Sequence, residues 1–137
     1  MRKPRLELAP IREAIEKTLE GEKRPEAEVS ALVVSDTRIR ALNRRYREID
    51  SPTDVLSFPM ADGEFANLHP DVLGDIVISV DRAESQAKAA GHSLMDELKL
   101  LAIHGTLHLL GFEDETAPGR AKMLRLARRY LRRVETR

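Results

Sequence analysis

Two of the four histidines in the chain stand four residues apart, in the stretch HGTLHLLGFEDE that spans residues 104–115. His104 and His108 fall in an apolar segment that indicates a helix, where residues four apart share one face and have β-carbons about 5–6 Å apart. Two imidazoles on one face can bind a single metal ion, since histidine is the commonest metal ligand in proteins. The alternative is a pair of core histidines whose rings are hydrogen-bonded to backbone carbonyls.

A third ligand is available just beyond the predicted helix. We expect Gly111 to end the helix and to let the chain turn back toward the histidines. Three acidic residues follow this glycine and are candidates for the third ligand: Glu113, Asp114 and Glu115. Two imidazoles and one carboxylate would leave a fourth position open for water, as in catalytic zinc sites. The glycine and the acids therefore favour a metal site over the structural alternative.

The residue beside the first histidine limits the chemistry of such a site. Metallopeptidases with the HExxH motif use the same histidine spacing, and their glutamate serves as the general base. Gly105 stands at that position here, so a peptidase of this kind would lack its base. A metal site without this carboxylate suits phosphodiester cleavage, in which a cation and nearby positive charge stabilise developing negative charge. A minimal zinc metallopeptidase is therefore the less favoured reading.

The rest of the chain must supply the elements that position these residues. Apolar periodicity and terminal signals predict helices at residues 8–22, 36–46, 82–91, 94–110 and 116–135. Apolar and β-branched runs predict strands at residues 5–8, 28–36, 53–59 and 73–80. The strand at 28–36 is expected to be buried, and the strand at 53–59 to lie near a sheet edge because prolines bracket it. The predicted fold class is α+β, a small mixed sheet packed against helices, with a buried central helix that carries the histidines.

Local patterns predict how the later helices begin and which side of the last one is buried. Asp81 and Glu84 form a capping-box pattern for the helix at 82–91, and Ser93 and Asp96 repeat it for the next helix. The apolar stripe of the last helix is expected at Leu124, Ala127, Leu131 and Val134.

Length and composition describe an ordinary globular protein. With 137 residues, the chain is near the commonest domain size, so we expect a single domain over residues 1–137. No apolar run approaches the roughly 20 residues that span a bilayer, which predicts no contact with a membrane. The start of the chain lacks the apolar core of a signal peptide, and the chain has no cysteine, which together favour the cytoplasm. Without cysteine, a transition metal must be held by nitrogen and oxygen ligands.

The formal net charge of zero hides an uneven distribution. Residues 120–137 contain eight basic residues and one acidic residue, whereas residues 48–75 contain seven acidic residues and no lysine or arginine. The basic end is either a surface for a polyanion or the solvated face of an amphipathic helix.

Three blocks of the sequence resemble the YbeY family of metal-dependent endoribonucleases, in the order and spacing of that family. HGTLHLLGFED (104–114) resembles the signature HGxLHLxGYDH, LNRRYREIDSPTDVLSFP (42–59) resembles LNxxYRxxxxPTDVLSFP, and LGDIVIS (73–79) resembles the GDIxI strand. The resemblance covers nearly the whole chain. It implies a single-strand-specific endoribonuclease of ribosomal RNA maturation and ribosome quality control. The implied partners are single-stranded ribosomal RNA and the ribosome or its associated proteins.

The resemblance also implies the site residues. His104 and His108 match the first two zinc ligands, while the third ligand, a histidine in the family pattern, falls on Asp114. Aspartate binds Zn²⁺ well, so we expect one zinc ion per chain to be retained, with Mn²⁺ or Mg²⁺ admitted more readily by the harder oxygen ligand. Arg47 matches the arginine of the family's YR pair and is expected to bind the scissile phosphate. Arg47 and His108 form the predicted catalytic set, with either water or a ribose 2′-hydroxyl as the nucleophile.

The sequence also gives expectations for two residues of the predicted strand at 53–59 and for the two remaining histidines. Asp54 and Ser57 either line the cleft or serve as a structural cap and a packed strand residue. His69 and His92 are expected to be ordinary surface residues. The aspartate in the third ligand position also supports an alternative within the family, a non-catalytic ribosome assembly factor whose zinc is structural.

Overall fold

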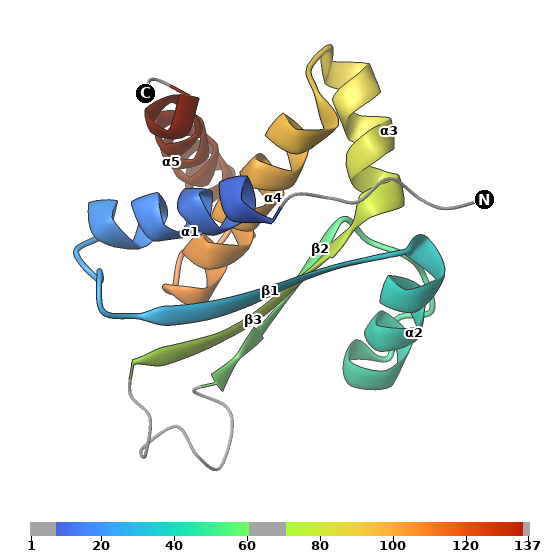
Figure 1. The fold of residues 1–137 in the computed structure, drawn as a ribbon. Helices are drawn as coiled ribbons and strands as arrows, with labels where there is room; N and C mark the ends of the chain where they lie inside the picture. Colours follow the sequence, from blue (N-terminus) through green and yellow to red (C-terminus); the bar gives the residue numbers. More distant parts are fainter. Residues whose placement is uncertain (1–7, 61–70, 136–137) are drawn as a thin grey trace.

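The computed structural model describes residues 8–60 and 71–135, and Figure 1 shows the arrangement of its elements. In chain order they are α1 (Ala9–Gly21), β1 (Glu28–Val34), α2 (Asp36–Arg47), β2 (Val55–Pro59), β3 (Val72–Ser79), α3 (Val80–Ala90), α4 (Leu94–Leu109) and α5 (Ala117–Glu135). The fold is α+β, as predicted. The candidate strand at 5–8 lies outside the described residues apart from Leu8, and His69 lies outside them too.

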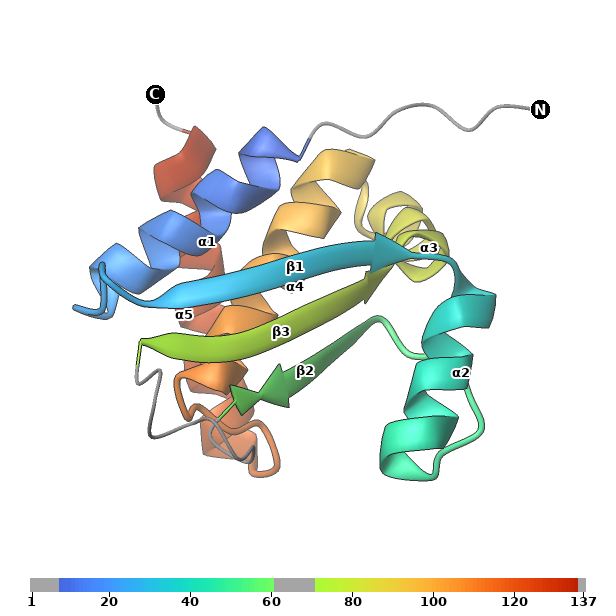
Figure 2. The same ribbon diagram turned by 60° about the horizontal axis from the view of Figure 1, so that its bottom comes forward.

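β3 is the central strand of a three-stranded mixed sheet with the order β1-β3-β2. β1 pairs with it in parallel and β2 in antiparallel, so that Leu32 and Leu56 both lie beside Val77. β3 is apolar on both faces over residues 76–78, where helices pack against both faces, whereas Asp75 is exposed. Ile76 and Ile78 are buried with α1 and α4, and Val77 is buried with α2. Figure 2 shows α1 and α4 on one side of the sheet, and α2 beyond one end of the strands.

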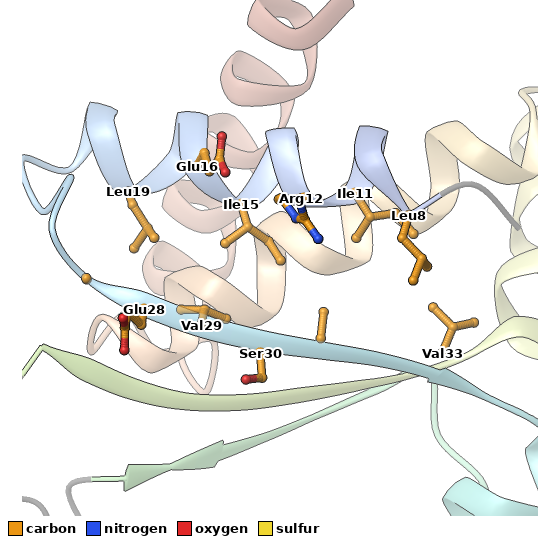
Figure 3. A pocket seen from close by; sticks show the side chains of 12 residues that line it. Leu8, Ile11, Arg12, Ile15, Glu16, Leu19, Glu28, Val29, Ser30 and Val33 are labelled. Atoms are coloured by element: carbon orange, nitrogen blue, oxygen red, sulfur yellow. The ribbon is translucent and has the colours of Figure 1, made fainter. Parts of the chain in front are cut away.

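β1 is largely exposed and lies at the edge of the sheet formed by residues 8–60 and 71–135, so the prediction that it is buried is wrong. Within the described part of the chain it pairs with β3 alone, and Leu32 in its middle is 56% exposed. Its inner face is covered by α1: Val29 and Val33 face Ile11 and Ile15 across a groove of about 440 Å³ (Figure 3). The apolar run was a correct signal for a strand, but it could not reveal that this strand lies at the edge of the described sheet.

α4 is the buried central helix, as predicted. It begins at Ser93, whose Oγ accepts a hydrogen bond from the backbone N–H of Asp96 at 3.1 Å. In its middle the helix lies close to the sheet, since a β-carbon added to Gly105 would lie 2.8 Å from Cγ2 of Ile76. The helix therefore holds the segment that carries the histidines directly against β3.

The start of α3 differs from the sequence-based expectation. Ser79 is its N-cap, because the Ser79 Oγ accepts a hydrogen bond from the backbone N–H of Arg82 at 3.2 Å. The Asp81 carboxylate instead accepts one from the backbone N–H of Asp36 at 2.7 Å. Since β3 runs directly into α3, the cap falls on the last strand residue, and Asp81 is used to join α3 to the start of α2.

The predicted buried stripe of α5 is confirmed in part. Ala127 and Val134 are buried, and Leu131 packs against the same cluster. Leu124 is 48% exposed, and the large buried residues of the helix are Met123 and Tyr130. The Tyr130 hydroxyl donates a hydrogen bond to the Glu22 carboxylate, and its ring leaves no room for a β-carbon at Gly21. This contact between α5 and the end of α1 selects which side of α5 faces inward. No helix within residues 8–60 and 71–135 is long and apolar enough to cross a membrane.

Candidate metal centre

Three potential ligands converge at the C-terminal end of α4. The Nε2 atoms of His104 and His108 are 3.1 Å apart. Oδ2 of Asp114 lies 3.5 Å from Nε2 of His104 and 3.4 Å from Nε2 of His108. In the described part of the chain, these are the residues grouped closely enough to hold a metal ion together. Of the acidic residues that follow the helix, it is therefore Asp114 that meets the histidines.

The spacing of the three donor atoms fits a tetrahedral ion. Bonds of about 2.0–2.2 Å to nitrogen and oxygen place neighbouring donors of a tetrahedron roughly 3.3–3.5 Å apart. The separations of 3.1, 3.4 and 3.5 Å are close to that range. The three side chains are 29–39% exposed, so the cluster is open to solvent on one side. Two imidazoles, one carboxylate and an open side form a donor set suited to Zn²⁺ in a catalytic rather than a closed structural site.

The turn after α4 carries Asp114 back to the histidines. Gly111 has a φ of 103°, in the left-handed region. Its N–H donates to the carbonyl of His108, and the N–H of Phe112 donates to the carbonyl of Leu107, both at 3.0 Å. This pair of bonds is the Schellman motif, in which glycine avoids the steric cost of a left-handed conformation. The predicted end of the helix at Gly111 is confirmed.

Arg120 holds the same turn from the first part of α5, and sequence reasoning missed this role. Its Nη1 donates to the backbone carbonyls of Asp114 and Glu115, each at 3.2 Å. From the sequence alone, Arg120 was only the first of the eight basic residues at positions 120–137. A bond from a side chain to carbonyls five and six residues earlier has no local sequence signal.

The surroundings of His104 favour the form that binds metal. Burial lowers the pKa of His104 and the neighbouring His108 lowers it further, while the carboxylates of Asp114 and Asp54 act in the opposite direction. Because a metal ion binds the neutral imidazole, a lowered pKa reduces competition from protons at neutral pH.

A cleft of about 530 Å³ opens beside the three ligands. The predicted residues Arg47, Asp54 and Ser57 all line it, although they belong to α2 and to the segment around the start of β2. Nη2 of Arg47 donates to the carbonyl of Ser57 at 2.7 Å, and its guanidinium carbon lies 5.8 Å from the centre of the Phe58 ring. These contacts hold the guanidinium at the rim of the cleft, and four of its five N–H donors remain for a ligand.

Asp54 and Ser57 also have the structural roles that were the alternatives to lining the cleft. Oδ1 of Asp54 accepts a hydrogen bond from the N–H of Val55 at 2.8 Å, and its Oδ2 accepts one from Gln86 of α3 at 3.2 Å. The Ser57 hydroxyl donates to the carbonyl of Gly105 at 3.2 Å. Gln86 is a second residue that sequence reasoning missed, since its partner lies 32 positions away in the chain.

Two expectations about other residues can be compared with the structure. His92 is half-buried rather than on the surface, with its Nε2 at 2.6 Å from Oε1 of Glu97. Both residues lie at the start of α4, at the opposite end from the metal cluster.

Gly105 packs against Ile76 of the sheet, so its position faces the core. A glutamate there could not act as the base of a peptidase, which supports the earlier argument against that reading.

Comparison with known proteins agrees with this architecture. The model of the family described as "Endoribonuclease YbeY" matches residues 4–135. "Endoribonuclease YbeY" of Syntrophus aciditrophicus is 44% identical over 114 residues, which are 83% of this chain and 71% of that protein. Its counterpart in Geobacillus kaustophilus is 53% identical over 96 residues, which are 66% of this chain and 62% of that protein.

A solved structure is similar over most of the chain. The solution structure of TM1509 from Thermotoga maritima matches with a TM-score of 0.65 and 28% sequence identity, and the match covers 93% of this chain and 80% of that one. The family match over residues 4–135 and the 44% identity to the Syntrophus aciditrophicus protein show that the chain belongs to the YbeY endoribonuclease family.

Proposed function

We propose that this protein is a metal-dependent endoribonuclease that cleaves single-stranded RNA during ribosomal RNA maturation and ribosome quality control. The observation that carries the proposal is one cleft in which Arg47 lies beside the cluster of His104, His108 and Asp114. Membership of the YbeY family supports the ribonuclease activity. The place in ribosomal RNA maturation is drawn from the family resemblance.

His104, His108 and Asp114 would hold the ion. A cation bound there supplies Lewis-acid charge and lowers the pKa of water, which is the chemistry that phosphodiester hydrolysis needs. The two nitrogen donors favour Zn²⁺, and the carboxylate oxygen makes Mn²⁺ or Mg²⁺ acceptable. Asp114 also adds a negative charge to the cluster. We therefore expect a weaker preference for Zn²⁺ than three histidines would give.

Arg47 is the residue that we propose binds the scissile phosphate. Its guanidinium is anchored through the Ser57 carbonyl, so the side chain is already oriented toward the cleft before RNA arrives. A guanidinium can donate two parallel hydrogen bonds to phosphate oxygens and can neutralise the charge that develops on them in the transition state. His108, the other member of the proposed catalytic set, acts as a ligand at the same cluster.

The exposed side of α5 is the proposed surface for the RNA backbone. Its arginines and lysine are exposed, whereas Met123, Ala127 and Tyr130 of the same helix are buried. A polyanion bound mainly through such side chains dissociates steeply as salt concentration rises, because counterions are released on binding. We propose that this surface meets ribosomal RNA or the ribosome, in the cytoplasm, with residues 1–137 acting as a single domain.

The test is cleavage of an end-labelled single-stranded RNA by the purified protein with added Zn²⁺ or Mn²⁺. EDTA and the His108→Ala variant should both abolish cleavage. Arg47→Glu should reduce turnover strongly and leave the metal content unchanged. Arg44→Glu, the same charge change on α2, is the matched control and should cleave normally. The 3′ ends of the products identify the nucleophile, since attack by the 2′-hydroxyl leaves a cyclic phosphate and attack by water does not.

The alternative within the family predicts a different result. A ribosome assembly factor with a structural metal would bind RNA or ribosomes without cleaving them. If the protein binds RNA or ribosomes but the RNA is unchanged in every lane, the proposal of a nuclease would be wrong and that of an assembly factor would be supported. The solvent-open side of the cluster favours the nuclease, because structural zinc sites are closed by a fourth protein ligand.

A further inference from the structure

The outer face of the sheet carries a second groove, on the opposite side of β2 from the metal cluster. It has a volume of about 610 Å³ and lies between α2, β1 and β3. Its lining is mainly apolar and aromatic, with Leu32, Leu42, Tyr46, Phe58 and Val77. α2 covers only part of this face (Figure 2), which leaves Tyr46 58% exposed and Leu32 56% exposed.

Two aromatic rings line one side of this groove, and each has a guanidinium group close to it. The rings of Tyr46 and Phe58 meet edge to face with centres 5.5 Å apart. The guanidinium carbon of Arg45 lies 5.4 Å from the centre of the Tyr46 ring, and that of Arg47 lies 5.8 Å from the centre of the Phe58 ring. Tyr46 is exposed and Phe58 is partly buried. Aromatic rings beside arginines form the kind of surface on which the bases of single-stranded nucleic acids stack.

The groove and the metal cleft are joined through Arg47. Successive residues of a strand point to opposite faces, and Ser57 faces α4 while Phe58 faces the groove. Arg47 contacts both, through a hydrogen bond to the carbonyl of Ser57 and through the ring of Phe58. Tyr46 is its neighbour in the chain. A nucleotide whose phosphate lies at Arg47 therefore has the aromatic groove within reach of a base on the same strand.

The charges in the groove suit a base better than a phosphate. The charged side chains among its lining residues are Arg38 and Asp75, whose charges cancel. Arg45 and Arg47 contact the aromatic rings but are not among the residues that line the groove. The Asp75 carboxylate would repel a phosphate but can accept a hydrogen bond from an N–H group on the edge of a base. The apolar lining further disfavours a charged group, because burying a charge without a partner is costly.

We propose that the Tyr46–Phe58 groove binds one unstacked base of the RNA whose phosphate lies at Arg47. The inference rests on the proposed function, because it takes RNA as the substrate. It gives that function a physical origin for single-strand preference, since a base held in a duplex is not free to enter the groove.

The test measures binding of the zinc-loaded protein to a short labelled RNA with 2′-O-methyl groups and phosphorothioate linkages, which resists cleavage. The same oligonucleotide with abasic sites is the comparison ligand. Tyr46→Ala and Tyr46→Leu should each weaken binding to the intact RNA by roughly 5- to 100-fold, as expected for loss of one base stack. Tyr46→Phe keeps the aromatic ring and should bind as the natural protein does.

The abasic RNA makes the assignment specific. Tyr46→Ala should bind abasic RNA as the natural protein does, and its dependence on salt should be unchanged because no phosphate contact is lost. Equal affinity of Tyr46→Ala and the natural protein for intact RNA would overturn the base site, and so would an equal loss on abasic RNA. Cleavage of unmodified RNA is measured in parallel. If the natural protein cleaves RNA but Tyr46→Ala binds RNA normally, only the proposed base site is rejected. If the natural protein neither binds nor cleaves RNA, the proposed function is rejected as well.

Discussion

Asp114 is the residue that distinguishes the proposed metal cluster from a site of three histidines. Its Oδ2 lies 3.4–3.5 Å from both imidazole nitrogens, so Asp114→Ala would leave two ligands on one helix. We expect zinc affinity to fall by more than the roughly 10- to 100-fold that loss of an outer-shell partner costs. Asp114→His should keep zinc and bind Mn²⁺ less well, because it replaces oxygen by nitrogen.

Competition titrations against a chromophoric chelator measure both effects. Glu113→Ala is the control, since Glu113 is an exposed neighbour outside the cluster and should bind zinc normally. Unchanged zinc affinity of Asp114→Ala would remove Asp114 from the ligand set.

Gly105 is required by packing. In an exposed helix a change from glycine to alanine stabilises the protein by up to about 1 kcal/mol. Here the new methyl group would lie 2.8 Å from Cγ2 of Ile76, and overpacking of this kind costs about 1–3 kcal/mol. Gly105→Ala should therefore lower the free energy of unfolding, measured by urea denaturation. Combining it with Ile76→Ala should cost less than the sum of the two single changes. Strict additivity would show that the two side chains do not compete for the same space.

At the scale of elements, the turn from α4 to α5 determines where Asp114 lies. The Schellman bonds at Gly111 set the direction of the chain, and Arg120 fixes the carbonyls of Asp114 and Glu115. Arg120→Met keeps an unbranched side chain but removes both hydrogen bonds. We expect zinc affinity to fall by about 10-fold, the lower end of the effect of outer-shell partners, with little change in Tm because Arg120 is exposed.

Arg125→Met is the matched control on the same helix, and isothermal titration with zinc is the measurement. Equal affinities of the two variants would mean that the turn holds Asp114 in place without Arg120.

The same elements show which features could be predicted from sequence. The spacing of His104 and His108 and the stop at Gly111 depend on residues within one or two helical turns, so local rules predicted them correctly. The same rules limited the candidates for the third ligand to three acidic residues, and the family resemblance then indicated Asp114. Arg120, Gln86 and the edge position of β1 depend on contacts between segments distant in the chain or on the order of strands, and no local pattern encodes those.

At the scale of the whole molecule, Tyr130 joins the first and last helices of the described chain. Its hydroxyl donates to Glu22 just after α1, and the residue is 1% exposed. Burial and the hydrogen bond to Glu22 raise the pKa of Tyr130 to about 12, compared with about 10 in an unfolded chain. The folded protein thus holds this proton more tightly. The associated stabilisation is complete below pH about 10 and is lost as the pH rises toward about 12.

Tyr130→Phe removes both the hydrogen bond and the titration, so it separates Tyr130 from every other group that titrates in alkali. At pH 8 we expect the variant to be less stable by about 1 kcal/mol, the net worth of a typical hydrogen bond. Between pH 8 and pH 11 the natural protein should lose on the order of 1 kcal/mol more than the variant, because about half of the pKa shift has by then been titrated. The gap should therefore close or reverse in urea unfolding at pH 11. An equal gap at both pH values would mean that the Tyr130 proton is not held by the fold, and that α1 and α5 are joined by packing alone.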